Sequence, residues 1–110
     1  MKYFIDFDGT ICPNNDGPPQ KECIEVLKRL KECNHEIIIY SCRSNPECVE
    51  DANQSTQDMI AYLNAYGVPF DGIEKNKPFF NYYIDDRAVG VPLTSDFSVD
   101  WAKIKLLNKI

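Results

Sequence analysis

The sequence predicts an α/β fold, a doubly wound and mostly parallel sheet with helices on both faces. Short hydrophobic runs alternate along the chain with longer amphipathic runs, which is the order of a βαβ pattern. One hydrophobic run, residues 36–40, holds three consecutive isoleucines, which indicates a strand that is buried on both faces. Because the chain has 110 residues, we expect one domain that spans residues 1–110.

The first part of the chain is expected to contain two strands and a helix. Residues 2–7 form the first strand, and a loop rich in turn-forming residues follows at 12–19. Residues 20–33 are expected to form a helix because apolar residues recur there every three or four positions. The helix ends before residues 36–40, which form the second strand.

The second part is expected to contain two helices and two further strands. A polar stretch, residues 41–53, leads into a helix of about a dozen residues that ends near Gly67. A short edge strand is predicted at 68–73 and another strand at 81–84. Residues 101–110 are expected to form a closing helix.

The composition narrows the classes of protein to which the chain can belong. Hydrophobic residues make up 44% and charged residues 26%, which is typical of a folded globular protein and not of a disordered one. The net charge of −5 argues against nucleic acid as a partner. No run is long enough to predict an export signal or a membrane span.

The five cysteines are odd in number and contain no Cys-x-x-Cys pair, and only one histidine is present. This pattern argues against a zinc cluster and for reduced thiols, most of them in the core. We therefore expect a cytoplasmic protein.

Polar residues that could take part in catalysis or ligand binding follow several of the predicted strands. Asp6 and Asp8 lie at the end of the first strand, and Ser41 follows the second. Asp85 and Asp86 follow the last predicted strand, residues 81–84. In a doubly wound sheet, ligands bind at the carboxyl ends of the strands. The sequence therefore predicts a functional site at this edge of the sheet.

The aspartates in this set are suited to a hard metal ion. Asp6 and Asp8 are two residues apart, so that in an extended segment they point to the same side. Gly9 lets the chain turn and lets backbone N–H groups approach a ligand. With Asp85 and Asp86, the first two aspartates make a group of four carboxylates, which repel one another unless a cation neutralises them. Oxygen ligands suit Mg²⁺.

These residues resemble the motifs of the haloacid dehalogenase superfamily of phosphotransferases. The segment DFDGT, residues 6–10, resembles the Asp-x-Asp-x-Thr motif of that family, and Ser41 after IIIY resembles its second motif. Lys77 in NKP resembles the third motif, and YIDD, residues 83–86, the fourth. The stretches IIIYSCR and KPFFNYYIDDRA are similar to small phosphatases of capsule or polysaccharide biosynthesis. The resemblance implies a single Rossmann-like core.

The resemblance also implies the roles of the residues in a Mg²⁺-dependent phosphatase. Asp6 is the nucleophile that forms an aspartyl-phosphate, and Asp8 protonates the leaving oxygen and then activates water. Mg²⁺ neutralises charge during the transfer. The phosphate-binding candidates are Gly9, Thr10, Ser41, Cys42, Arg43 and Lys77. The candidate metal ligands are Asp6, Asp8, Asp85 and Asp86.

Three of these assignments leave alternatives open. Lys75 is the alternative to Lys77 as the phosphate-binding lysine. Asp85 and Asp86 can exchange roles as direct and water-mediated metal ligands. Cys42 belongs to the segment around Ser41, but its side chain should point to the opposite side of an extended chain and be buried and inert.

The short connections between the motifs predict an enzyme without a cap domain and with an open site. Such a site can accept a bulky substrate or borrow a lid from a second copy of the chain. The loops at 12–19 and 44–53 are the segments long enough to overhang it. We expect Asn14 and Asn15 to select the substrate; in the alternatives, their loop is only a surface connection or supports the nucleophile.

The expected substrate is a small phosphorylated metabolite such as a sugar phosphate. Two other functions compete with this phosphatase. A protein of the same fold could bind a phosphorylated or nucleotide ligand without turnover. A response-regulator receiver domain is disfavoured because its phosphoacceptor aspartate ends a strand in the middle of the chain, where this sequence has Ser41.

Overall fold

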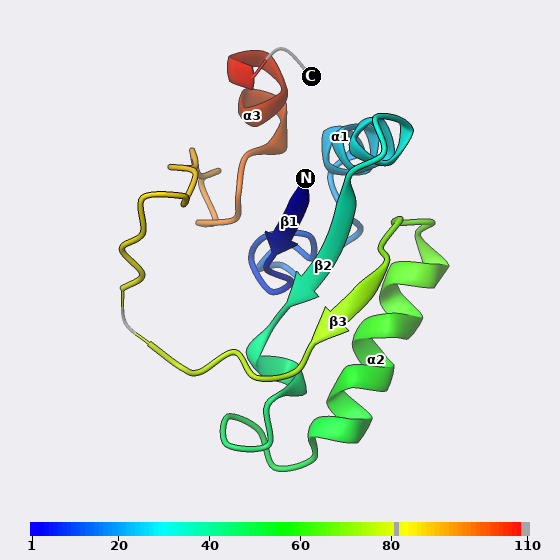
Figure 1. The fold of residues 1–110 in the computed structure, drawn as a ribbon, viewed down its shortest axis with the longest axis vertical. Helices are drawn as coiled ribbons and strands as arrows, with labels where there is room; N and C mark the ends of the chain where they lie inside the picture. Colours follow the sequence, from blue (N-terminus) through cyan, green and yellow to red (C-terminus); the bar gives the residue numbers. More distant parts are fainter. Residues whose placement is uncertain (81, 109–110) are drawn as a thin grey trace.

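The structure, a computed structural model, describes residues 1–80 and 82–108 (Figure 1). Its sheet contains three strands in the order β1-β2-β3, with β1 at Lys2–Ile5, β2 at Glu36–Tyr40 and β3 at Gly72–Glu74. Both pairings are parallel. The predicted α/β fold with a parallel sheet is confirmed.

Helices connect the strands as the βαβ pattern requires (Figure 1). Helix α1, Lys21–Glu32, lies between β1 and β2. The short 3₁₀ helix η1, Cys42–Ser44, and helix α2, Ala52–Ala65, lie between β2 and β3. Helix α3, Trp101–Asn108, follows near the end of the chain and packs on α1. These connections leave no room for a cap domain between the motifs.

The core gathers on one face of the sheet. Ile37 and Ile39 of β2 are fully buried, together with Leu27 of α1 and both Met59 and Leu63 of α2. Burial of side chains of this size stabilises the fold by about 1.5–3 kcal/mol each. The apolar stripes of both helices therefore meet the same side of β2.

The opposite face of the sheet is less covered than its sequence predicts. Ile38 is only partly buried, and its neighbour Phe4 on β1 is 52% exposed. The Phe4 ring contacts the ring of Tyr40, 5.1 Å away. The predicted burial of residues 36–40 is therefore complete on the face of Ile37 and Ile39 and only partial on the face of Ile38.

Two strand boundaries differ from those predicted. Strand β1 ends at Ile5 and not at residue 7, because the chain turns from Phe7 onwards. Strand β3 covers 72–74 and not 68–73. The N–H of Val68 donates to the carbonyl of Leu63 in α2, 2.9 Å away. Val68 therefore belongs to the C-terminal end of the helix, and the strand begins later. Gly67, with φ of +67°, takes the left-handed conformation expected at such an end.

The strand predicted at 81–84 is not present in the described part of that range. Asn81 lies outside the described residues, and residues 82–84 form no strand. Tyr82 is 89% exposed and Ile84 is 96% exposed. The connection from β3 to this segment consists of residues 75–80, whereas a parallel crossover takes about a dozen residues or more. The segment leaves the sheet as an extended loop (Figure 1).

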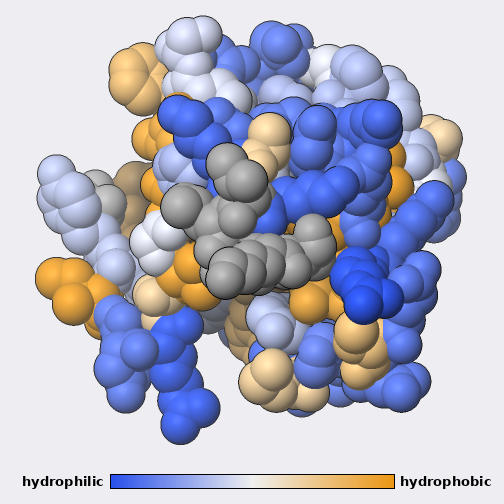
Figure 2. All heavy atoms as spheres, turned by 90° about the horizontal axis from the view of Figure 1, so that it is seen from above, coloured by the Kyte–Doolittle hydropathy of each residue, from blue (hydrophilic) through white to orange (hydrophobic). Residues whose placement is uncertain are grey.

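The surface is mainly polar. Hydrophilic residues predominate on the face shown in Figure 2, and apolar residues are scattered among them, as the net charge of −5 leads us to expect. None of the helices in the described residues combines the length and the apolar character that a bilayer crossing requires.

Candidate active site

The segment after β1 forms a tight turn that presents Asp6 and Asp8. The carbonyl of Phe7 accepts hydrogen bonds from the three N–H groups of residues 10–12, at 2.9–3.1 Å. Gly9 has φ of +73°, and a Cβ added there would lie 2.9 Å from Oδ1 of Asn14. The turn therefore requires glycine both for its backbone conformation and for the space that it leaves.

The carboxylate of Asp6 is held by two donors. Lys77 Nζ lies 3.0 Å from Oδ1, and the hydroxyl of Thr10 donates to Oδ2, also at 3.0 Å. The Lys77 side chain is only 15% exposed, and its ammonium lies 5.4 Å from the ring of Tyr40 and 5.7 Å from that of Phe80. The rings exclude water on two sides, which strengthens the electrostatic contact between Lys77 and Asp6.

Asp8 is held by Arg43 in a bidentate pair. Nε and Nη2 of Arg43 each lie 2.8 Å from one carboxylate oxygen of Asp8. The guanidinium also lies over the ring of Phe7, 5.1 Å from its centre. The hydrogen bond to Asp8 raises the pKa of Arg43, which therefore stays cationic.

The backbone of Arg43 connects this pair to Ser41. The N–H of Arg43 donates to the hydroxyl of Ser41, 3.2 Å away, and Ser41 is buried at the point where β2 ends. The carboxyl ends of β1 and β2 thus bring together the residues of the first two motifs, as the parallel pairing of these strands leads us to expect.

The segment after η1 also positions the backbone of Lys77. The carbonyl of Lys77 accepts a hydrogen bond from Nδ2 of Asn45 at 2.8 Å and one from the thiol of Cys48 at 3.6 Å. Asn45 is itself buried. Sequence reasoning did not find Asn45 or Cys48, because their partner at the site is a backbone atom.

Cys42 is not buried as the sequence predicts. Its side chain has intermediate exposure, and its thiol donates to the carbonyl of Pro78, 3.5 Å away. The prediction assumed that the chain stays extended after Ser41, so that alternate residues face opposite sides. The chain turns instead into η1, and this turn directs Cys42 toward the segment of Lys77.

Lys75 lies in a different place from Lys77. It lines a hollow beside the loop that precedes α2, together with Ser44, Asp51 and Asn76. Of the two lysines, it is Lys77 that the structure brings to the Asp6 carboxylate.

Asp85 and Asp86 are not brought to the carboxylates of the first motif. Among the residues that the structure describes, no three acidic, cysteine or histidine side chains form a cluster that could hold a metal ion. Asp85 is bonded locally, to the hydroxyl of Tyr83 and to the N–H of Arg87, and the Tyr83 hydroxyl lowers its pKa most. Both aspartates follow the segment that leaves the sheet, and this is why they lie outside the site.

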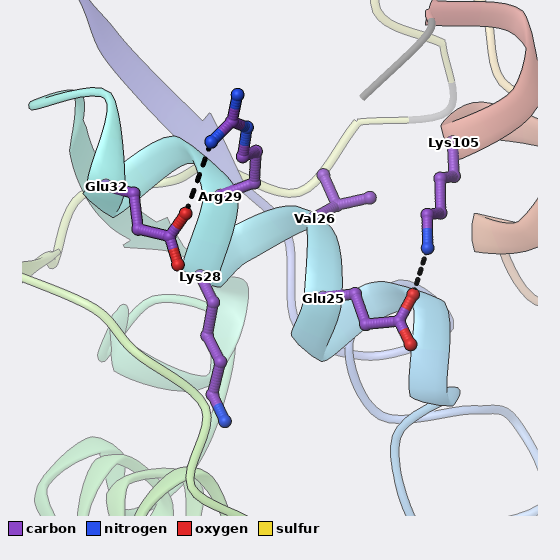
Figure 3. A pocket seen from close by; sticks show the side chains of 6 residues that line it. All are labelled: Glu25, Val26, Lys28, Arg29, Glu32 and Lys105. Atoms are coloured by element: carbon purple, nitrogen blue, oxygen red, sulfur yellow. Dashed lines mark hydrogen bonds and ion pairs between the residues drawn. The ribbon is translucent and has the colours of Figure 1, made fainter.

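Another hollow is lined by residues of α1 and by Lys105 of α3, and none of the candidate site residues lines it (Figure 3). Its polar lining is largely paired. Lys105 of α3 reaches Glu25, and Arg29 lies 3.3 Å from Glu32. The contact between Lys105 and Glu25 ties α3 to α1, so this hollow has a structural role.

The active-site turn is braced by residues near the other end of the chain. The N–H of Val99 donates to the carbonyl of Gly9 at 2.7 Å, and the indole N–H of Trp101 donates to the carbonyl of Thr10 at 2.8 Å. The N–H of Asn14 donates to the hydroxyl of Ser98, 2.7 Å away. Of the residues in these contacts, Ser98, Val99 and Trp101 were not predicted to act at the site. No local sequence signal marks this brace, because its hydrogen bonds join residues far apart along the chain.

Asn14 is exposed, but its side chain is engaged in supporting the turn. Its side chain lies against Gly9 and donates to the carbonyl of Asp96, 3.0 Å away. Asn15 accepts a hydrogen bond from the N–H of Gly17. The contacts favour the alternative in which this loop supports the nucleophile over the expectation that it selects the substrate.

The comparisons with known proteins agree with the motif geometry. A family model for haloacid dehalogenase-like hydrolases matches residues 3–93. The chain belongs to this family. This haloacid dehalogenase-like hydrolase is also similar to a protein from Vibrio cholerae with a known crystal structure, with a TM-score of 0.69 and 29% sequence identity. The similarity covers 98% of this chain and 96% of the other. No curated protein matches the chain.

Proposed function

We propose that the protein is a phosphatase that acts through an aspartyl-phosphate on a small phosphorylated metabolite such as a sugar phosphate. One observation carries the proposal: a carboxylate, Asp6, lies in contact with the ammonium of Lys77, and a second carboxylate two residues further on, Asp8, lies in contact with the guanidinium of Arg43. Such a set combines a nucleophile, a proton carrier and two cations for phosphate oxygens.

In the first half-reaction, a carboxylate oxygen of Asp6 attacks phosphorus and the bond from phosphorus to the ester oxygen breaks. Asp8, in its protonated form, gives its proton to the leaving oxygen. In the second half-reaction, Asp8 takes a proton from water, and the water oxygen attacks phosphorus of the aspartyl-phosphate. Inorganic phosphate leaves and the Asp6 carboxylate is restored.

Lys77 and Arg43 are suited to hold the phosphate oxygens during both steps. Each cation now contacts a carboxylate, and a bound phosphate offers three more oxygens to the same donors. The hydroxyl of Thr10 keeps the attacking carboxylate oriented, since it bonds to one of its two oxygens. The buried hydroxyl of Ser41 supplies a further donor at the end of β2.

Members of the family generally use Mg²⁺, and a metal supplies charge neutralisation in phosphoryl transfer. The oxygen donors of Asp6, Asp8, Asp85 and Asp86 have the right chemistry. Their positions do not fit, however, because the described residues gather no cluster of three metal-binding side chains. The steps above are therefore derived from the residues of the chain alone. We propose Mg²⁺ as the cofactor on the donor chemistry alone, and treatment with EDTA tests it: loss of activity would show that a metal is needed, and unchanged activity would show that the residues of the chain suffice.

A second function, binding of a phosphorylated ligand without turnover, is favoured by the separation of Asp85 and Asp86 from Asp6. Both functions use the same cations. They differ in whether phosphate is released and in whether the reaction needs the nucleophile.

The experiment compares Asp6→Asn with the wild-type chain on an aryl phosphate and on a panel of sugar phosphates and nucleotides, with Mg²⁺. Asn is close in shape to Asp but is a poor nucleophile, so we expect release of phosphate to fall by about 10³-fold or more. Asp58→Asn, on the exposed side of α2, is the matched control and should keep full activity. Full activity of Asp6→Asn would overturn the mechanism, and tight ligand binding by a wild type without turnover would establish the second function.

A further inference from the structure

Cys42 and Cys48 are two partly exposed thiols that both contact the segment of Lys77. The thiol of Cys42 donates to the carbonyl of Pro78 at 3.5 Å, and the thiol of Cys48 donates to the carbonyl of the preceding residue, Lys77, at 3.6 Å. Both thiols therefore contact the same two-residue segment, Lys77 and Pro78. Independently, the hydrogen bond with Cys48 is among the causes that raise the pKa of Cys42, after burial.

The other three cysteines have different surroundings. Cys12 and Cys23 are buried, and burial raises the pKa of both, that of Cys23 to about 12, so these thiols stay protonated and shielded. Cys33 is exposed at the end of α1. Among the five thiols, the contacts thus single out Cys42 and Cys48 as a pair that an oxidant can reach.

We propose that Cys42 and Cys48 are a modification site at which a peroxide forms a reversible disulfide. The sulfur of Cys48 attacks one peroxide oxygen, the O–O bond breaks, and the sulfur becomes a sulfenic acid while water leaves. The sulfur of Cys42 then attacks the sulfenic sulfur, and a second water leaves with the thiol proton. Two thiols and one hydrogen peroxide give one disulfide and two waters.

The order of the two attacks follows from the surroundings of Cys42. Since burial and the Cys48 thiol raise the pKa of Cys42, its thiol is held protonated, and Cys48 is the sulfur that reacts first. A dithiol reductant reverses the reaction by thiol–disulfide exchange and is itself oxidised.

The disulfide would act on the residues that hold the phosphate-binding cations; this consequence rests on the proposed function. The closed loop, residues 42–48, contains Arg43, which binds Asp8, and Asn45, which holds the carbonyl of Lys77. Both S–H donors to residues 77 and 78 disappear on oxidation. A displacement of about 1 Å at such a site can lower the rate by about 10²-fold, so oxidation should reduce phosphatase activity by tenfold or more.

The test uses peptide mapping of the full chain and does not depend on activity. Trypsin cleaves after Lys31, Arg43 and Lys75, which places Cys42 in peptide 32–43 and Cys48 in peptide 44–75. Peptide 32–43 also contains Cys33, and the protein used is therefore Cys33→Ser. After limited hydrogen peroxide and alkylation of the remaining thiols, we expect the two peptides to be linked, and dithiothreitol to separate them.

The controls are Cys33→Ser combined with Cys48→Ser, which must give no linked peptide, and the Cys33→Ser variant that has not been oxidised. The proposal is overturned if peroxide yields sulfinic acid at either cysteine without a link, or leaves both thiols free for alkylation. The activity of each protein is compared with that of its own reduced form. A linked peptide with unchanged aryl phosphatase activity would keep the site and overturn its effect on the cations. A reduced protein without activity would count against the proposed function and leave the mapping result intact.

Discussion

The chain contains two short, mainly apolar runs that differ in structure, residues 36–40 and residues 79–84. Each is followed by a polar residue of the predicted motifs. The first run is β2, paired on both sides by parallel strands. The second contains no strand in its described residues, and its apolar side chains face solvent. Ile39 is fully buried, whereas Ile84 is 96% exposed.

The comparison shows that an apolar run becomes a strand where the chain also supplies neighbours for it. Helices α1 and α2 return the chain to the sheet on either side of β2 and cover Ile37 and Ile39. Residues 75–80 contain no such helix. The same difference separates the motifs, since Ser41 follows the paired run and lies at the site, while Asp85 follows the unpaired run and does not.

The largest expected effect is on stability. Ile39→Ala should lower the free energy of unfolding by about 2–5 kcal/mol, because it leaves a cavity in the core. Ile84→Ala should change it by about 0.5 kcal/mol or less, because the side chain is exposed. Urea denaturation of both variants measures the difference. An equal cost at the two positions would break the comparison and show that residues 79–84 are packed in solution.

The next effect concerns the two lysines on either side of Asn76. Lys77→Ala should lower kcat/KM for an aryl phosphate by about 10²–10³-fold, because it removes a cation that contacts the nucleophile. Lys75→Ala should have little effect, since Lys75 lines a separate hollow. Steady-state kinetics on both variants decides the matter. A larger loss for Lys75→Ala would move the phosphate-binding role to that lysine.

A smaller effect is expected from Asn14. Asn14→Ala removes the hydrogen bond to the carbonyl of Asp96 and the contact with Gly9, and it should lower kcat/KM by about threefold to tenfold. The loss should be the same for an aryl phosphate and for a sugar phosphate, because the residue supports the turn. Asn15→Ala is the control. A loss confined to the sugar phosphate would restore the view that this loop selects the substrate.

The smallest effect is a change in the pH dependence of stability. Asp71 accepts hydrogen bonds from Lys31 and from the N–H of Ile37, each 2.7 Å away, and these lower its pKa, with Lys31 the larger cause. A lowered pKa stabilises the fold fully above the unfolded value of about 3.9, and this contribution is lost as the pH falls through the folded value. Asp71→Asn should therefore lower Tm at pH 6 and flatten its fall toward pH 3. Thermal unfolding between these pH values measures both, and parallel curves would show that the carboxylate is not linked to folding.

Much of the fold could be predicted because its signals are local. The spacing of apolar residues in α1 and the isoleucines of β2 gave both elements within one residue of their observed boundaries. Strand β3 was placed too early, because Val68 completes α2 before the chain reaches the sheet. The length of the connection before residues 82–84, and not their composition, decides that they form no strand.

The candidate site also contains residues that could be recognised from the sequence and residues that could not. Asp6, Thr10, Ser41 and Lys77 could be recognised because their motifs are short segments of sequence. The brace formed by Ser98, Val99 and Trp101 could not be recognised, because its hydrogen bonds to the turn join residues more than eighty positions apart and mostly use backbone atoms. Nothing in the local sequence of either segment records such a contact.

The brace also sets the order in which the site matures during synthesis. The ribosome makes Gly9 and Thr10 early, but Val99 and Trp101, which bond to their carbonyls, only much later. Contacts so distant along the chain form slowly, because a long loop must close first. A nascent chain therefore carries Asp6 for most of its translation without the support that holds the turn. On the proposed function, we therefore expect phosphatase activity only after residue 101 has left the ribosome.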